Sequence, residues 1–273
     1  MEWNLNIPKI LHIYWGGGVL HNLRFMTIKT FMKYNPDWEV ILWYPKYPSI
    51  NRTWFSTEQK YIIGCKDFIE EAMNLSITKN PIDFEEFGFS NTMSEVHKAD
   101  FIRLHLLSTL GGVWSDMDIF YIKSMNSLYF NTKENKDVVT FYCDHNYGHS
   151  IGFLMSSVNN KFYKELIEIA KREFHPGDYQ AIGARIFCKY FNTPESINRM
   201  GPAINMDMDV VYPHDATYYA ELLNTNTPKF TKNTIGVHWY AGAQIWEKFL
   251  ETTNGGLINL PNNIIGNLLK NEC

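Results

Sequence analysis

The sequence contains few cysteines: Cys65, Cys143, Cys188 and Cys273 are the only four among 273 residues. No two of them have the CxxC spacing or the ligand spacing of a zinc site. The cysteine spacing therefore gives no indication of a fold held together by disulfides or organised around a structural zinc ion. We expect free thiols, which are typical of a reducing compartment.

The sequence also lacks an excess of positive charge and any long apolar run. Its net charge of −4 provides no general attraction to nucleic acid or to an anionic membrane. No segment approaches the roughly 18 consecutive apolar residues of a membrane-spanning helix, and the first residues, MEWNLNIPK, contain no signal-peptide core. We therefore expect a cytoplasmic protein without a nucleic-acid partner, in contact with a membrane at most peripherally.

Hydrophobic residues make up 45% of the chain and aromatic residues 15%, which is enough for a sizeable core. Aromatic side chains also provide flat surfaces on which ring-shaped ligands stack. A carbohydrate-binding protein without catalytic activity is therefore one class to consider. No internal repeat, low-complexity segment or linker divides the sequence, so we expect a single domain over residues 1–273.

The first fifty residues have the pattern of a strand, a helix and a second strand. Residues 9–15 (KILHIYW) are rich in strand-forming residues and end at three glycines, residues 20–34 have helical spacing, and residues 39–44 form another apolar strand. Because strand–helix–strand units of this length usually connect parallel strands, we expect a parallel sheet at the start of the fold.

The rest of the chain continues to alternate between helices and strands, which predicts an α/β fold. One long helix is expected from the caps Ser90 and Asn91 to Leu110, where Gly111 and Gly112 end it. The other expected elements are helices at 56–74, 159–174, 178–190 and 257–270, strands at 113–115, 119–122, 137–143, 151–156, 209–212 and 234–238, and a loop at 76–91.

Two charged residues interrupt the apolar side of the helix that ends at Leu110. At 100° per residue, Asp100 and Arg103 lie beside positions that would normally face the core. Burying such charges without partners is costly. The two residues therefore form either a structural ion pair or part of the lining of a polar ligand site.

Asp116 and Asp118 follow the next short strand. Residues two apart in an extended segment point to the same side, so both carboxylates converge. A cation relieves their repulsion, and oxygen ligands suit Mg²⁺ or Mn²⁺ bound together with a substrate's phosphate oxygens. A metal-dependent phosphohydrolase is an alternative, although Phe120 stands where the D-x-D-x-T pattern of haloacid-dehalogenase-type enzymes has threonine.

These residues belong to a longer pattern. Residues 99–118 fit A-D-x-x-R-x-x-x-L-x-x-x-G-G-x-Y-x-D-x-D with Trp114 in place of tyrosine, and IPKILHIYWGGG at 7–18 is similar to IPK-x-I-H-x-x-W-x-G. The chain therefore resembles the DXD-containing sugar transferases of glycosyltransferase family 32 and the related glucosylating clostridial toxins. Looser similarities are Met200-Gly201-Pro202, Val211-Tyr212-Pro213 and HWYAGAQIW at 238–246.

The resemblance implies a GT-A fold, which is a mixed Rossmann-like sheet that binds a nucleotide sugar and is flanked by helices, with added helices. Residues 1–125, ending in the DXD motif, would form the nucleotide-sugar-binding half, and residues 126–273 the acceptor-binding half and closing segment. The implied activity is retaining transfer of a sugar from a nucleotide-diphosphate donor, a UDP-sugar being favoured, to a hydroxyl of a saccharide or glycolipid in surface polysaccharide or oligosaccharide synthesis. A protein acceptor, as for the toxins, is the alternative.

The resemblance also implies roles for four residues of the long motif. Asp118 would be a direct ligand of Mn²⁺ or Mg²⁺, and Asp116 would face the metal or the ribose. Asp100 and Arg103 would contact the sugar hydroxyls and the diphosphate of the donor. A carboxylate accepts hydrogen bonds from hydroxyls and a guanidinium neutralises phosphate, so the residue types suit these roles.

Both ends of the chain supply further candidates by the same resemblance. Trp15 matches a residue that stacks on uracil, with Ile13 and Tyr14 as neighbouring backbone; an ordinary core aromatic is the alternative for Trp15. His238 and Trp246 match an element that closes over the diphosphate, where His238 would be a metal ligand or a hydrogen-bond donor to phosphate; a core histidine is its alternative. No residue is identified as a nucleophile or a general base.

Overall fold

The computed structural model describes residues 5–49, 61–62, 64–128, 138–143, 148–179, 181–193, 195–196 and 203–272. The strands are β1 (Ile10–Tyr14), β2 (Glu39–Pro45), β3 (Thr78–Ile82), β4 (Gly112–Ser115), β5 (Ile119–Tyr121), β6 (Val138–Cys143), β7 (Gly148–Ser156), β8 (Ala203–Met206) and β9 (Gly236–His238). The helices are α1 (Asn22–Tyr34), α3 (Ile69–Asn74), α4 (Glu95–Thr109), α5 (Lys161–Glu173), α6 (Ala184–Tyr190), α8 (Glu221–Asn224), α9 (Trp246–Thr252) and α10 (Ile264–Glu272), with short 3₁₀ turns η1 (Phe84–Phe87), η2 (Met125–Ser127) and η4 (Met208–Val210).

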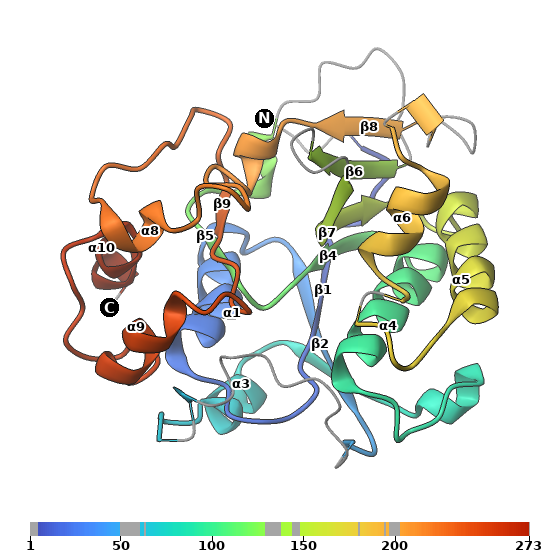
Figure 1. Cartoon of the computed structure of the whole chain (residues 1–273), viewed down its shortest axis with the longest axis horizontal. Helices are drawn as coiled ribbons and strands as arrows, with labels where there is room; N and C mark the ends of the chain where they lie inside the picture. Colours follow the sequence, from blue (N-terminus) through green and yellow to red (C-terminus); the bar gives the residue numbers. More distant parts are fainter. Residues whose placement is uncertain are drawn as a thin grey trace.

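A seven-stranded sheet runs through the molecule in the order β3-β2-β1-β4-β7-β6-β8 (Figure 1). The expected parallel start is confirmed, because β1 pairs parallel with β2 and β4, and β2 with β3. β7 is antiparallel to both β4 and β6, which makes the sheet mixed. A separate two-stranded sheet joins β5 to β9. The expected mixed α/β architecture is therefore confirmed.

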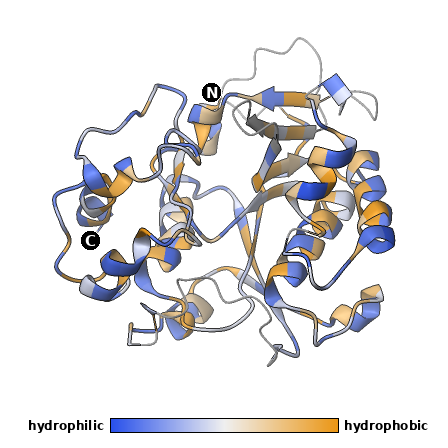
Figure 2. Cartoon of the chain, viewed as in Figure 1, coloured by the Kyte–Doolittle hydropathy of each residue, from blue (hydrophilic) through white to orange (hydrophobic). Residues whose placement is uncertain are grey.

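Helices cover both faces of this sheet. In Figure 1, α4, α5 and α6 lie on one side, whereas α1 lies on the other and α8, α9 and α10 gather near the C-terminus. Successive strand residues serve the two faces: Val113 packs in the cluster that contains α1, and Trp114 in the cluster that contains α4 and α5. The helices carry both hydrophobic and hydrophilic residues (Figure 2), as expected for helices packed on a sheet.

Helix α4 places the charged pair and ends as the glycines predict. Gly111 has φ +65° and donates its N–H to the Leu106 carbonyl, which closes the last turn. The start differs from the prediction, because Ser94 caps the helix by accepting a hydrogen bond from the His97 N–H. Asn91 instead binds the start of η1, where its Oδ1 accepts from the Phe84 N–H.

Several other elements differ from their predictions. Residues 64–68 are not helical, and α3 begins only after Asp67, whose Oδ1 accepts hydrogen bonds from the N–H groups of Leu20 and Ile69. The expected loop at 76–91 contains β3, a partly exposed strand with Pro81 in it. The expected strand at 209–212 is η4 instead, and β8 was not predicted. Every helix of the described residues is too short or too polar to span a membrane.

Candidate active site

The topology of the sheet creates a ligand site at the ends of β1 and β4. From β1 the chain proceeds outward through β2 and β3, and then returns through β4 to the opposite side of β1. The carboxyl ends of β1 and β4 thus lie at a point where the strand order reverses, and open α/β sheets bind ligands at such points. Trp15 follows β1 and Asp116 follows β4, so both lie at this edge.

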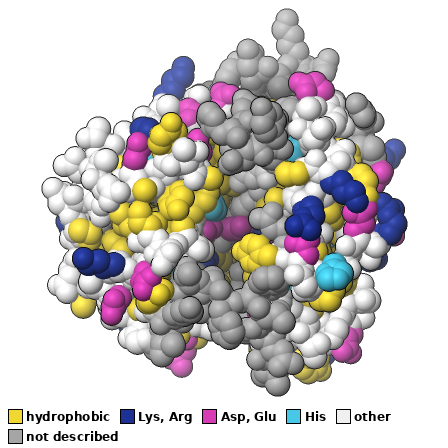
Figure 3. All heavy atoms as spheres, viewed as in Figure 1, with side chains coloured by type: hydrophobic (Ala, Val, Ile, Leu, Met, Phe, Trp, Pro, Cys, Tyr) yellow, Lys and Arg dark blue, Asp and Glu magenta, His cyan; other side chains and the backbone are white. Residues whose placement is uncertain are grey.

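A cleft of about 360 Å³ opens at this edge. Trp15, Asp100, Arg103, Asp116 and Asp118 all line it, so the structure brings these five predicted residues together. Figure 3 shows acidic and histidine side chains at the centre of this face, bordered by hydrophobic ones. The cleft is thus charged at its base and apolar around it.

Asp116, Asp118 and His238 form the most compact group of potential metal ligands among the described residues. One ligand atom from each lies within 4.8 Å of the others. Pairing of β5 with β9 explains the arrangement, because Ile119 lies directly opposite His238 and so brings the histidine next to Asp118. His238 Nε2 lies 3.2 Å from Asp118 Oδ1.

Backbone contacts fix the orientation of this group. Asp118 Oδ2 accepts a hydrogen bond of 2.9 Å from the Ala241 N–H, and the Tyr240 N–H lies 3.3 Å from His238 Nδ1. Asp118 Oδ1 is buried and accepts no well-aligned hydrogen bond from the described part of the chain. A buried carboxylate oxygen without such a donor is well suited to a cation.

Gly152 of β7 lies beneath the same atoms. A Cβ placed on Gly152 would be 3.1 Å from each of three polar atoms: Asp116 Oδ2, His238 Nε2 and the Tyr212 hydroxyl. The absence of a side chain at residue 152 therefore leaves these groups facing a common position. Two carboxylates, an imidazole and a small polar cradle fit a divalent cation such as Mn²⁺ or Mg²⁺.

Arg103 connects helix α4 to the aspartate pair. Its Nη2 lies 3.3 Å from Asp100 Oδ1 and 2.9 Å from Asp116 Oδ1. Trp114 Nε1 donates to the same Asp116 oxygen at 2.8 Å, and the guanidinium lies over the Trp114 ring. Arg103 is only 4% exposed, so these contacts hold it between two carboxylates at the base of the cleft.

The three aspartates have different proton affinities. Burial raises the pKa of Asp100 to about 6, against the attraction of Arg103. Burial likewise raises the pKa of Asp116, which Arg103 opposes. Burial also acts to raise the pKa of Asp118, but the nearby His238 and the Arg24 guanidinium outweigh it and hold that pKa below its usual range. Asp118 is therefore the firmly ionised member of the pair.

Trp15 lines the cleft and is half-buried. Its Nε1 donates to the Gly18 carbonyl at 3.1 Å, and the Arg24 guanidinium lies 5.2 Å from the ring centre. These contacts hold the indole at the mouth of the glycine-rich loop rather than in the core. The position suits stacking on a flat ligand ring.

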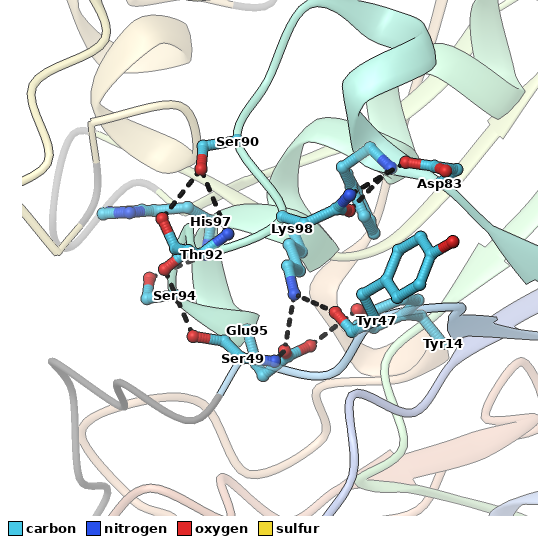
Figure 4. A network of polar contacts seen from close by, with 12 residues as sticks. Tyr14, Tyr47, Ser49, Asp83, Ser90, Thr92, Ser94, Glu95, His97 and Lys98 are labelled. Atoms are coloured by element: carbon cyan, nitrogen blue, oxygen red, sulfur yellow. Dashed lines mark hydrogen bonds and ion pairs between the residues drawn. The ribbon is translucent and has the colours of Figure 1, made fainter.

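A polar network built on Glu95 lies against the glycine loop that lines the cleft (Figure 4). Glu95 Oε1 accepts hydrogen bonds from the Ser49 N–H and the Lys98 ammonium, both at 2.8 Å, and Oε2 accepts one of 2.7 Å from the Tyr14 hydroxyl. A Cβ on Gly16 would be 2.2 Å from Oε2, so the carboxylate lies directly against the glycine loop. The Lys98 side chain is completely buried.

Three further predicted residues, Ile13, Tyr14 and Trp246, have buried side chains. Ile13 is completely buried in the core beside α1, and Tyr14, although buried, is among the residues that line the cleft. Trp246 is also completely buried, 5.0 Å from Trp239 between ring centres, and it does not line the cleft. The element Met200-Gly201-Pro202 lies outside the described residues.

Sequence reasoning missed Arg24, Glu95, Gly152 and Tyr212. Each has an ordinary local context, and their convergence depends on pairing between distant strands. The Asp-x-Asp triplet, in contrast, carries its own signal because two carboxylates occupy one strand end. The local pattern that could have indicated the Glu95 network is a glutamate followed three residues later by a lysine on the same helix.

Comparison with known proteins gives one family match. The profile described as "Glycosyltransferase sugar-binding region containing DXD motif" matches residues 24–135, which is less than half of the chain. The range includes Asp100, Arg103, Asp116 and Asp118. No curated protein matches the sequence.

Solved glycosyltransferase structures are similar to this one at low sequence identity. GlyE from Streptococcus pneumoniae TIGR4 has a TM-score of 0.51 and 8% identity, over 97% of this chain and 60% of GlyE. PaToxG glycosyltransferase has a TM-score of 0.49 and 15% identity, over 71% and 69% of the two chains. The glycosyltransferase involved in glycosylation of the major capsid of PBCV-1 has a TM-score of 0.45 and 13% identity, over 88% and 97%.

The similarity to GlyE confirms the expected GT-A fold. The chain spans 60% of the length of GlyE, so the comparison concerns the fold alone. The family match supports the expectation that the chain is a transferase, because it covers the DXD motif and the charged helix residues. Residues 24–135 of this GT-A fold thus match the profile of a DXD-containing glycosyltransferase sugar-binding region.

Proposed function

We propose that this protein is a metal-dependent retaining glycosyltransferase of family 32. It would move a sugar from a nucleotide-diphosphate donor, a UDP-sugar being favoured, to a hydroxyl of a saccharide or glycolipid acceptor. The observation that carries the proposal is the convergence of Asp116, Asp118 and His238 within 4.8 Å at the switch point of the sheet. The neighbouring cleft has room for a ligand, and Trp15 is one of the residues that line it.

Asp116, Asp118 and His238 would hold Mn²⁺ or Mg²⁺. When bound, the cation supplies positive charge to the diphosphate as it leaves the sugar. Arg103 already lies beside Asp116 at 2.9 Å, so its guanidinium is placed to contact the same phosphates and stabilise the charge that develops on them. The low exposure of Arg103 strengthens this interaction by excluding water.

Asp100 and Trp15 would orient the two ends of the donor. The Asp100 carboxylate, 7% exposed and one helical turn from Arg103, would accept hydrogen bonds from sugar hydroxyls. Trp15 would stack on the base. Fixing both ends holds the anomeric carbon in place for attack, which reduces the entropic part of the barrier.

The proposal requires no protein nucleophile. Retention of configuration is implied by the family resemblance, and a front-face route, in which the leaving phosphate helps to deprotonate the acceptor hydroxyl, needs neither a nucleophile nor a separate base. The protein's contribution is then to bind the donor, neutralise the leaving group and exclude water.

A thermal-shift screen of nucleotide sugars, each with and without Mn²⁺, tests this function. UDP-sugars with Mn²⁺ should raise the melting temperature of the wild-type protein, and Mn²⁺ or the donor alone should raise it less. Stabilisation by free sugars without a nucleotide would favour a carbohydrate-binding protein instead. Hydrolysis of simple phosphate esters in the absence of a sugar donor would favour a phosphohydrolase.

A further inference from the structure

Tyr212 faces the position above Gly152 that Asp116 and His238 also face. Its side chain is 2% exposed, and its hydroxyl lies 3.1 Å from the position that a Gly152 Cβ would occupy. Among the described residues, the hydroxyl has no well-aligned hydrogen-bond partner, although Ser150 is near enough to act on its pKa. A buried hydroxyl in this state is uncommon, because burial removes its contact with water.

The surrounding backbone holds Tyr212 in this orientation. The Tyr212 N–H donates to the Met208 carbonyl at 2.7 Å, and the His238 N–H donates to the Val211 carbonyl at 2.8 Å. The tyrosine ring packs edge-on against Phe141, at 5.4 Å between ring centres, and lies 5.0 Å from the His238 ring. The hydroxyl is therefore kept beside the candidate metal ligands by contacts that a phenylalanine would make equally well.

We propose that Tyr212 is a positioning residue of the cation site, whose hydroxyl donates a hydrogen bond to an oxygen atom bound above Gly152. This inference rests on the proposed function. The oxygen belongs either to the diphosphate of the donor or to a water molecule on the cation; both accept a hydrogen bond in the same way. A tyrosine hydroxyl is protonated at neutral pH and is therefore able to donate this hydrogen bond.

Other groups around this position do not supply the same donor. Asp116 and Asp118 are acceptors when ionised, and Arg103 is a charged donor whose Nη2 contacts Asp100 and Asp116 and is not among the three atoms nearest the position of a Gly152 Cβ. His238 Nε2 faces Asp118 at 3.2 Å. Tyr212 is the neutral donor that the described residues place at this point, which explains why a polar hydroxyl is buried there.

The variant Tyr212→Phe tests the inference, because it removes only the hydroxyl. Mn²⁺ binding is measured by electron paramagnetic resonance titration, alone and with saturating UDP, and UDP binding by calorimetry at saturating Mn²⁺. We expect the melting temperature without ligands to change little, since no well-aligned hydrogen bond to a described residue is lost. The affinity of Tyr212→Phe for Mn²⁺ or for UDP should fall by about tenfold, because the variant loses one hydrogen bond to a charged acceptor.

The two arms of the titration identify the oxygen. A loss of Mn²⁺ affinity without UDP assigns it to water on the cation, and a loss confined to UDP binding assigns it to the diphosphate. Tyr163→Phe is the matched control: Tyr163 is equally buried, its hydroxyl also has no hydrogen-bond partner among the described residues, and this hydroxyl is not among the three atoms nearest the position of a Gly152 Cβ. We expect Tyr163→Phe to bind Mn²⁺ and UDP as the wild type does.

A second variant, Gly152→Ala, tests the same position from the opposite side. Its new Cβ would be 3.1 Å from the three polar atoms, so it should lower the affinity for Mn²⁺ or UDP even though the hydroxyl is present. Wild-type affinities for both Mn²⁺ and UDP in Tyr212→Phe would overturn the inference and leave the proposed function standing, whatever the effect of Gly152→Ala. A wild-type protein that binds neither Mn²⁺ nor UDP would overturn the proposed function, and this inference with it.

Discussion

Arg103 Nη2 lies 2.9 Å from Asp116 Oδ1 and 3.3 Å from Asp100 Oδ1. The sequence left two alternatives for the Asp100–Arg103 pair, a structural ion pair or the lining of a ligand site. Both descriptions apply to the structure, because the ion pair itself forms part of the cleft wall. Arg103 thus links the sugar end of the proposed donor site to its metal end.

Replacing Arg103 by lysine tests whether activity requires the planar guanidinium group or only a positive charge at residue 103. Lysine keeps the positive charge but presents one ammonium in place of the planar fork, so it does not reproduce the contacts with both aspartates and a phosphate. We expect the sugar-transfer rate of Arg103→Lys to fall by on the order of tenfold or more, with a melting temperature within a few degrees of the wild type. The exposed Arg172→Lys serves as control and should change neither quantity. A strongly lowered melting temperature with an unchanged rate would leave Arg103 a purely structural role.

Trp15 and Trp246 provide a matched pair of tryptophans at the two ends of the family pattern. Trp15 lines the cleft, whereas Trp246 is completely buried against Trp239. Base stacking on an aromatic ring contributes roughly 1–3 kcal/mol, so Trp15→Ala should weaken UDP binding by about 5- to 150-fold. Trp246→Phe should lower the melting temperature and leave the dissociation constant of UDP unchanged. Calorimetry measures the UDP dissociation constant of both variants. Equal UDP affinity in Trp15→Ala and wild type would show that Trp15 does not stack on the base.

His12 should make stability depend on pH. It is completely buried in β1, accepts a hydrogen bond from Trp43 Nε1 at Nδ1, and has Nε2 2.8 Å from the Gly111 carbonyl. Burial lowers its pKa from 6.5 to about 4, so between these values the unfolded chain takes up a proton that the folded protein does not. Stability is therefore complete above pH 6.5 and falls as the pH is lowered through this window.

The variant His12→Gln isolates this contribution. From pH 7 to pH 5, the wild type should lose about 2 kcal/mol more of its free energy of unfolding than His12→Gln does, since 1.5 pH units lie below the unfolded pKa. Urea unfolding at the two pH values measures the difference. The contributions of the other histidines to the free energy of unfolding cancel in this comparison, because both proteins contain them. The same loss in both proteins would show that His12 is protonated in the folded state.

The buried pair of Glu95 and Lys98 should be strongly coupled. Glu95→Gln leaves the completely buried Lys98 ammonium without its carboxylate, which should cost about 3–5 kcal/mol of unfolding free energy. Glu95→Gln combined with Lys98→Met should recover much of this loss, because no charge then remains buried. The exposed pair Lys171–Glu168 is the control, and Lys171→Met should change stability by less than about 1 kcal/mol. Additive effects of Glu95→Gln and Lys98→Met would contradict the coupling.

Local sequence patterns predicted the parts of the fold that have strong local signals. The strand–helix–strand start, the glycine end of α4 and the Asp116–Asp118 pair each depend on periodicity or turn chemistry within a few residues. β3 was missed because its exposed edge and Pro81 remove the alternating apolar pattern, and pairing with β2 stabilises it instead. The contact of His238 with Asp118 depends on pairing between β5 and β9, more than a hundred residues apart, which periodicity does not encode.

The most direct test of the account measures release of sugar from UDP-sugars with Mn²⁺, comparing the wild type with Asp118→Asn. Asparagine is nearly the same size as aspartate but lacks its charge, so we expect Asp118→Asn to fold with an unchanged circular dichroism spectrum. The account predicts Mn²⁺-dependent release by the wild type that a chelator abolishes, and background release by the variant. A folded Asp118→Asn protein with full activity, or wild-type activity that the chelator leaves intact, would contradict it.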